Sequence, residues 1–94
     1  MQITIKTIFG YTFELHDVYP ESTTVREICD KVRSHFDINF DEVALIYVGK
    51  DLMYERTLAE YQISEYYGEV AIHAVFKYTP EQIQAMIDRG YLQE

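Results

Sequence analysis

The residues best suited to nucleophilic chemistry in this sequence are one cysteine, Cys29, and three histidines, His16, His35 and His73. A cysteine thiolate beside a histidine can attack a carbonyl group when a third group orients the histidine as a base. Cys29, however, falls on the apolar stripe of a predicted helix, and a thiol buried in apolar surroundings is inert. The histidines are too scattered for a zinc site. We therefore predict no enzyme activity, no cofactor and no metal site.

The N-terminal segments alternate between apolar and polar residues and predict strands at 2–6 and 12–16. Ile3 and Ile5 define the apolar face of the first strand. Between the two strands, Gly10 supplies a residue that tolerates positive φ, as a bulged hairpin turn needs. The pattern predicts an antiparallel hairpin with one apolar face.

A helix is predicted over 24–36, where Thr24 is the N-cap and Glu27 completes a capping box. Its apolar residues recur at helical spacing and form one stripe: Val25, Ile28, Cys29, Val32 and Phe36. Because the hairpin and the helix each have one apolar face, we expect them to cover each other.

Three more extended segments follow the helix. The short apolar run at 43–48 predicts a third strand, and Gly49-Lys50 turns the chain into a brief return strand at Leu52 and Met53. The segment 56–63 is too short for an average helix and predicts a single turn. A last strand is predicted at 70–76. This order of elements predicts an α+β fold of the β-grasp type, in which a mixed sheet wraps around one helix.

A second helix is predicted after residue 79, where Thr79 and Gln82 form a capping box and Gly90 ends the helix. Its short apolar stripe consists of Ile83, Met86 and Ile87. The sequence predicts a domain at 1–78 with a helical extension at 79–94. Three possibilities remain open for the stripe: it covers the sheet near Ile8 and Ile46, it binds a partner or a second copy of the chain, or it leads into a longer protein.

Composition excludes several classes of function. The 94 residues carry 16 acidic and 8 basic side chains, a net charge of −8, which disfavours nucleic acid as a partner. No apolar run is long enough to span a bilayer, so we expect no membrane partner. A lone cysteine rules out an internal disulfide framework, and a cytoplasmic or nuclear location is the expectation.

Two blocks of the sequence resemble the ubiquitin family. The first is the opening Met1-Gln2-Ile3-Thr4-Ile5-Lys6-Thr7-Ile8-Phe9-Gly10. The second is Gly49-Lys50-x-Leu52 followed by Arg56-Thr57-Leu58-x-x-Tyr61-x-Ile63. The similarity spans residues 1–76 and implies the same β-grasp fold. It narrows the function without fixing it, because function depends on sites carried by a fold.

The C-terminal part departs from the conjugated members of that family. Those members react through a Leu-Arg-Gly-Gly end preceded by an arginine, and the corresponding residues here are Val75, Phe76, Lys77 and Tyr78. The chain ends Gly90-Tyr91-Leu92-Gln93-Glu94, without a diglycine. The expectation is a module that is not conjugated. The alternatives are a covalent modifier that requires C-terminal processing, and the N-terminal regulatory domain of a larger protein.

The resemblance also implies a protein-binding surface. Its apolar centre corresponds to Ile8, Ile46 and His73, with Ala71 and Lys50 beside it, while Ala44 replaces a basic residue of the rim. Aromatic residues near the hairpin tip and the third strand extend this set. The predicted protein-binding residues are Ile8, Phe9, Tyr11, Ile46, Tyr47, Lys50, Ala71 and His73. Tyr66 and Tyr67 could add to the surface.

The expected partners are ubiquitin-binding domains and proteasome or ligase components, and one version of the function is a ubiquitin mimic. Self-association through the C-terminal helix or the hairpin tip is a further possibility. In the interior, Cys29 and Tyr54 stand where the family has a buried lysine and its aspartate partner. Replacing both members of such a pair can be neutral, so we expect Cys29 to be structural.

Overall fold

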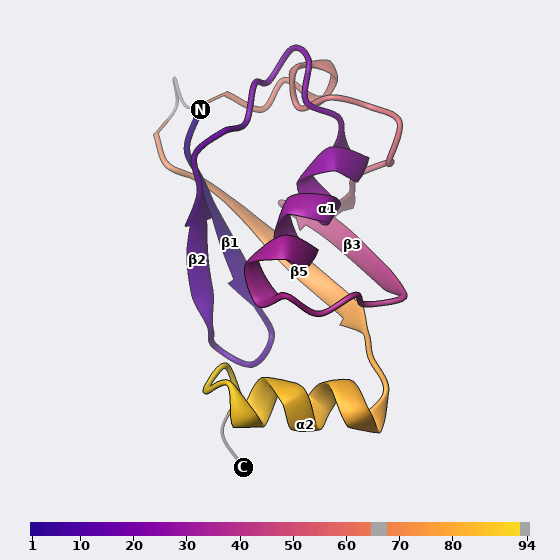
Figure 1. Ribbon diagram of the computed structural model, residues 1–94. Coiled ribbons are helices and arrows are strands. Elements are labelled where there is room, and N and C mark those ends of the chain that lie inside the picture. The colour runs from indigo at the N-terminus through magenta and orange to yellow at the C-terminus, as the bar shows by residue number, and fades with distance from the viewer. Residues whose placement is uncertain (65–67, 93–94) are drawn as a thin grey trace.

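One mixed five-stranded sheet organises the chain, and helix α1 lies across one of its faces (Figure 1). The computed structural model describes residues 1–64 and 68–92. The strands are β1 (Ile3–Thr7), β2 (Thr12–Leu15), β3 (Glu42–Tyr47), β4 (Lys50–Asp51) and β5 (Val70–Lys77). They are arranged in the order β2-β1-β5-β3-β4, with β1 and β5 parallel at the centre. This is the predicted β-grasp fold.

Alternation of side chains sets the two faces of the sheet. In β1, Ile3 and Ile5 are fully buried, and Ile5 is paired with Phe13 of β2. In β5, Ile72 and Ala74 are likewise fully buried. Gly10 adopts a φ of 86° in the turn between β1 and β2, a value that a residue with a β-carbon rarely adopts. The predicted hairpin is confirmed.

Helix α1 (Val25–Phe36) packs its predicted stripe into the core. The Glu27 amide donates to Thr24 Oγ1 at 3.2 Å, and the Thr24 amide donates to Glu27 Oε1 at 3.3 Å. This capping box satisfies amides that the first helical turn leaves unpaired. The stripe residues Val25, Ile28, Val32 and Phe36 are fully buried.

The return strand differs from the prediction. It consists of Lys50–Asp51, because Tyr47 pairs directly with Lys50 and leaves only Val48 and Gly49 in the turn. Leu52 was predicted in this strand but lies just beyond it; its amide donates to Leu45 O at 2.9 Å and its side chain is buried. A short 3₁₀ helix, η1 (Ala59–Tyr61), occupies the segment where a single turn was predicted.

Helix α2 (Pro80–Asp88) lies below the end of the sheet, next to the β1–β2 turn (Figure 1). It begins with the predicted capping box, in which the Gln82 amide donates to Thr79 Oγ1 at 3.2 Å. It ends in a Schellman motif: the Tyr91 amide donates to Met86 O at 2.9 Å, and the Gly90 amide to Ile87 O at 3.0 Å. In the described part of the chain, no helix has the length and apolar character needed to cross a membrane.

Candidate functional site

The face of the sheet opposite α1, here called the outer face, carries the alternate residues of β1, β5 and β3. Strand register places Lys6, His73 and Ile46 in one row, because Lys6 pairs with His73 and His73 pairs with Ile46. The neighbouring rows contain the pairs Ala44–Val75 and Thr4–Ala71. Residues far apart in the sequence therefore form one continuous surface.

The centre of the outer face is largely apolar. Ala44, Ile46 and Ala71 are half-buried, and Val75 has 37% of its surface exposed. Ile8, at the β1–β2 turn, is 72% exposed. A contiguous exposed apolar patch on a folded domain commonly marks an interaction site.

Charged groups border this apolar centre. Lys77 Nζ lies 3.3 Å from Glu42 Oε2, so these two charges largely compensate each other. Lys6 is exposed, and within the described residues it has no ion pair. Asp51 lies across from Ile46 on β4. The outer face therefore carries an uncompensated cation in a protein whose net charge is −8.

Two of the predicted binding residues occupy the edge near β4. Tyr47 shares the alternation of Val43 and Leu45 and packs, half-buried, against the core. Lys50 Nζ lies 5.0 Å from the centre of the Tyr61 ring, in a cation–π contact. Tyr61 is itself anchored, because its hydroxyl accepts a hydrogen bond from the Met53 amide at 2.8 Å. Because Tyr47 and Lys50 are cross-strand partners, both lie on the other side of the sheet from the row that contains Ile46.

The aromatic residues of the β1–β2 turn face the interior more than the solvent. Phe9 is half-buried against the core, with its ring centre 6.2 Å from that of Phe76. The Tyr11 ring lies 5.6 Å from Phe36 and 4.9 Å from Tyr91. Their role in protein binding stays a prediction. Tyr66 and Tyr67 lie outside the described residues.

Helix α2 closes the end of the domain where these rings gather. Met86 is fully buried in the same core cluster as Phe36 and Phe40, while Ile83 and Ile87 are half-buried. The stripe of α2 therefore packs on its own domain, and Ile8 remains exposed beside it. The sequence left open that this stripe covers the sheet near Ile8 and Ile46; it packs instead at the end of the domain. Binding of a partner or a second copy through α2, and continuation into a longer protein, stay predictions.

Polar contacts fix α2 against the C-terminal end of α1. Arg89 Nη1 donates to Phe36 O at 2.7 Å and to Asp37 O at 2.8 Å. Gln82 Nε2 donates to Asn39 O at 3.2 Å. A cation at the C-terminus of a helix also interacts favourably with the helix dipole. This covered end of the domain, formed by α2, the β1–β2 turn and residues 35–40, is called the closed end below.

His35 lies at the surface of the closed end, where its exposed side chain packs against neighbouring rings. Its ring stacks on Phe13 with centres 3.8 Å apart, and its Nε2 lies 2.9 Å from the Tyr11 hydroxyl. Burial lowers the pKa of His35 below its ordinary value, because desolvation disfavours the charged imidazolium. These contacts with Phe13 and Tyr11 give His35 a role in packing, and the ring of Tyr91 also lies near it.

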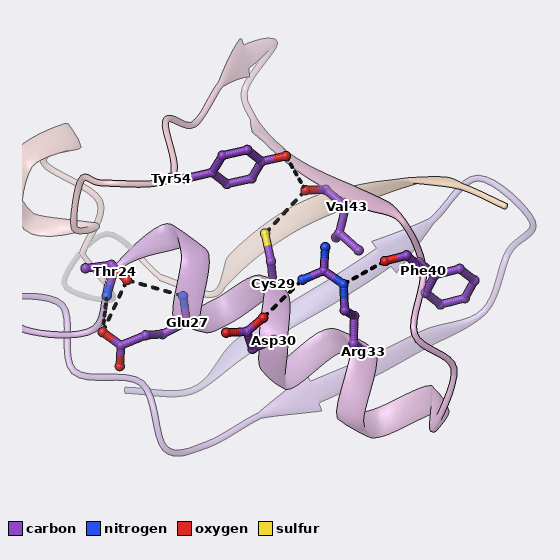
Figure 2. A network of polar contacts seen from close by, with 8 residues as sticks. All are labelled: Thr24, Glu27, Cys29, Asp30, Arg33, Phe40, Val43 and Tyr54. Carbon is purple, nitrogen blue, oxygen red and sulfur yellow. Dashed lines mark hydrogen bonds and ion pairs between the residues drawn. The ribbon is translucent and has the colours of Figure 1, made fainter.

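The side chain of Cys29 is buried in the interior, where it contacts β3 (Figure 2). Its Sγ donates to Val43 O at 3.4 Å, and the Tyr54 hydroxyl donates to the same oxygen at 2.9 Å. Burial raises the pKa of the Cys29 thiol to about 11. A thiol with such a pKa is a weak nucleophile at neutral pH. The shared acceptor explains why Cys29 and Tyr54 can occur together in place of an ion pair.

The polar contacts around Cys29 hold parts of the fold together. Arg33 Nε donates to Phe40 O at 2.9 Å, and its Nη1 forms an ion pair with Asp30 at 3.1 Å (Figure 2). These contacts join the outside of α1 to the loop that leads into β3. Among residues 1–64 and 68–92, no cluster of three His, Cys, Asp or Glu side chains is arranged to hold a metal ion.

Two exposed apolar residues near the outer face were not among the predicted site residues. Val75 lies on the outer face beside Ala44, and Val48 is 84% exposed in the β3–β4 turn. The sequence predicted Val48 as the last residue of the third strand, whereas β3 ends at Tyr47 and Val48 lies in the turn that follows. Its backbone conformation, with a φ of 49°, could not be foreseen from the residue type.

A comparison with known protein families gives a match that covers the strands of the outer face. The family model described as the ubiquitin family matches residues 3–78, which include all five strands and α1 and end before α2.

Proposed function

Because the chain belongs to the ubiquitin family, we propose that it is a non-conjugated protein-interaction module whose outer face binds partners of the ubiquitin pathway. The partners we propose are receptors with ubiquitin-binding domains and components of the proteasome or of ligases. In this role the protein acts as a ubiquitin mimic that competes for such receptors in the cytoplasm or nucleus.

The observation that carries the proposal is the open apolar centre of the outer face. Ile46 and Ala71 are half-buried at this centre, Ile8 is exposed at the β1–β2 turn, and α2 packs at the closed end. Burying these apolar side chains against an apolar partner removes their surface from water, which favours association. Lys6 and His73 add polar specificity in the same plane.

Two features support a role without conjugation. First, the resemblance relates both Ala44 and Val75 to basic residues of the conjugated members, and these two residues are direct cross-strand partners here. An apolar pair has therefore replaced a potential pair of cations. Second, the residues that follow β5 fold into α2 and place Met86 in the core, whereas conjugation requires an extended reactive segment.

Titration of the isotope-labelled protein with a three-helix ubiquitin-binding domain tests the proposal. Amide shifts should cluster at Lys6, Ile46 and His73, and Ile46→Ala should weaken binding at least about tenfold. Tyr19→Ala removes a more exposed apolar side chain from the β2–α1 loop, 62% exposed, and should leave affinity unchanged. Shifts confined to α1, or equal affinities for the two variants, would refute the assignment of the outer face.

A second experiment separates this function from covalent modification. The protein is incubated with ubiquitin-type activating enzymes and ATP, and a thioester is sought by non-reducing electrophoresis. We expect none, and a clear thioester would favour a processed modifier. Self-association through α2 or the hairpin tip stays a prediction, which sedimentation equilibrium can measure.

A further inference from the structure

The hydroxyl group of Tyr11 lies beside a base at the closed end. Its oxygen is 2.9 Å from Nε2 of His35, whose ring stacks on Phe13 with centres 3.8 Å apart. Desolvation lowers the pKa of His35, so the imidazole is neutral at neutral pH, and the tautomer with its proton on Nδ1 accepts the Tyr11 hydroxyl at Nε2. Desolvation also raises the pKa of Tyr11, so the hydroxyl keeps its proton. A phenol and an acceptor for its proton are therefore in direct contact.

The other tyrosines that the structure describes lack such an acceptor. The Tyr54 hydroxyl donates to Val43 O at 2.9 Å, and the Tyr61 hydroxyl accepts a hydrogen bond from the Met53 amide at 2.8 Å. A carbonyl oxygen is a much weaker base than an imidazole nitrogen. In the described part of the chain, Tyr11 is the only tyrosine whose hydroxyl lies within hydrogen-bond distance of a histidine. Because a phenol loses an electron more easily when its proton leaves at the same time, Tyr11 is the tyrosine best placed for one-electron oxidation.

A second phenol ring lies against Tyr11. Tyr91, which follows α2, meets it edge to face with ring centres 4.9 Å apart. The Tyr91 hydroxyl also contributes to the raised pKa of Tyr11, as expected for two neighbouring phenols. Both rings are half-buried, so an oxidant at the surface of the protein can remove an electron from either ring. Because Tyr11 belongs to the β1–β2 turn, a bond between the rings would tie α2 to the first hairpin.

We propose that Tyr11 and Tyr91 form an oxidative cross-linking site, with His35 as the acceptor of the Tyr11 proton. The oxidant is hydrogen peroxide acting through a haem peroxidase, which removes one electron at a time. The product is a dityrosine bond that fixes α2 at the closed end. This inference goes beyond the proposed function and does not depend on it, because both rings lie at the closed end and not in the rows of the outer face.

The cross-linking step removes two electrons and two protons in all. Tyr11 gives one electron to the peroxidase and its hydroxyl proton to Nε2 of His35, which passes the proton to water. Tyr91 gives the second electron to the peroxidase and its hydroxyl proton to water. The two phenoxyl radicals join through ring carbons next to the oxygen-bearing carbons, and each ring becomes aromatic again when the hydrogen of that carbon moves to the oxygen. One peroxide molecule takes up the two electrons and two protons and becomes two molecules of water.

Limited oxidation of the dilute protein tests the proposal. The full chain is treated with a haem peroxidase and one equivalent of hydrogen peroxide, and the monomer is digested with trypsin. The expected product joins the peptide 7–26 to the peptide 90–94, because trypsin cleaves after Lys6, Arg26 and Arg89. This product should be two hydrogen atoms lighter than the two peptides together, and it should show the blue fluorescence of dityrosine.

Single substitutions assign the role of each residue. Tyr11→Phe and Tyr91→Phe should each abolish this product, because a phenylalanine ring has no hydroxyl proton to lose. Tyr78→Phe is the matched control, since Tyr78 is 40% exposed and precedes α2, and it should leave the yield unchanged. His35→Gln keeps a polar side chain but removes the base, so it should slow formation of the product at least about tenfold.

The cross-link should also raise stability. It closes a loop that spans most of the chain and restricts the unfolded state, so Tm of the oxidised monomer should rise by at least about 8 °C. An unchanged Tm would contradict the fixing of α2. Cross-links spread over exposed tyrosines such as Tyr19, or an undiminished yield in Tyr91→Phe, would overturn the site. An unchanged rate in His35→Gln would overturn the role of His35 as the proton acceptor.

Discussion

The closed end and the outer face both carry apolar residues, but only the closed end is covered by the chain itself. At the closed end, Met86 fills the core, Tyr91 packs on Tyr11, and Arg89 binds carbonyl groups at the end of α1. At the outer face, Ile46 lies in one row with His73, and Ile8 is exposed.

The contrast shows that aromatic residues near the β1–β2 turn serve packing of the domain itself. The rings that sequence patterns suggested as contacts, Phe9 and Tyr11, are engaged at the closed end. The open surface is made of small aliphatic side chains, chiefly Ala44, Ala71 and Ile46. An apolar group is available to a partner only when its own chain has left it uncovered.

The largest difference between the two regions is expected for truncation of a single apolar side chain. Met86→Ala should lower the free energy of unfolding by about 2–4 kcal/mol, because it leaves a cavity in the core. Ile8→Ala, at an exposed position, should change it by less than about 0.5 kcal/mol. Urea denaturation measures both values. Similar losses for the two variants would contradict the division into a closed end and an open face.

The aromatic contacts of the closed end should give the next largest effect. The Tyr91 ring lies 4.9 Å from both Tyr11 and Phe36 in edge-to-face geometry. Tyr91→Ala should therefore cost about 1–2 kcal/mol of unfolding free energy. Tyr78→Ala is the control, since Tyr78 is exposed and no ring contact involves it among the described residues. An equal cost for Tyr78 would show that ring packing is not what fixes α2.

A smaller effect is expected for the arginine that joins α2 to α1. Arg89→Ala removes two hydrogen bonds to Phe36 O and Asp37 O and should cost about 1 kcal/mol, because part of each bond is replaced by water. Arg56→Ala should be neutral, since its side chain is exposed. Affinity for a ubiquitin-binding domain should not change in Arg89→Ala. A loss of affinity would mean that the closed end contributes to the outer face.

The smallest effect concerns pH. Burial lowers the pKa of His35, so the unfolded chain takes up a proton more readily than the folded one. The contribution of neutral His35 to stability is therefore complete above its ordinary pKa of 6.5 and is lost as the pH falls through the folded value. Unfolding should become easier as the pH falls below 6.5. His35→Gln should reduce this dependence, and an unchanged slope would exclude His35 as its source.

Local sequence patterns predicted most of the fold, because they report local requirements. The stripe from Val25 to Phe36 needs one buried face, and Thr24 and Thr79 each need a partner three residues later. Each of these signals involves only residues that are close together in the sequence. The coupled substitution of Cys29 and Tyr54 was also foreseeable, and the structure adds that both donate to Val43 O.

The position of α2 could not be predicted in the same way. The stripe of Ile83, Met86 and Ile87 requires a covering surface but does not specify which one. That choice depends on the tertiary arrangement of Phe36 and Phe40, residues more than 40 positions away in the sequence. The candidate site also depends on tertiary structure, because the row of Lys6, His73 and Ile46 exists only once three strands have paired.

The parallel pairing of β1 with β5 has a consequence for how the chain acquires its structure. Ile3 pairs with Val70 and Thr7 with Ala74, so the middle of the sheet joins segments from opposite parts of the sequence. During synthesis, β1 and β2 must wait as an isolated hairpin, which is only marginally stable in water. The chain can therefore reach its folded state only after β5 has left the ribosome, and its folding rate should be limited by this distant closure.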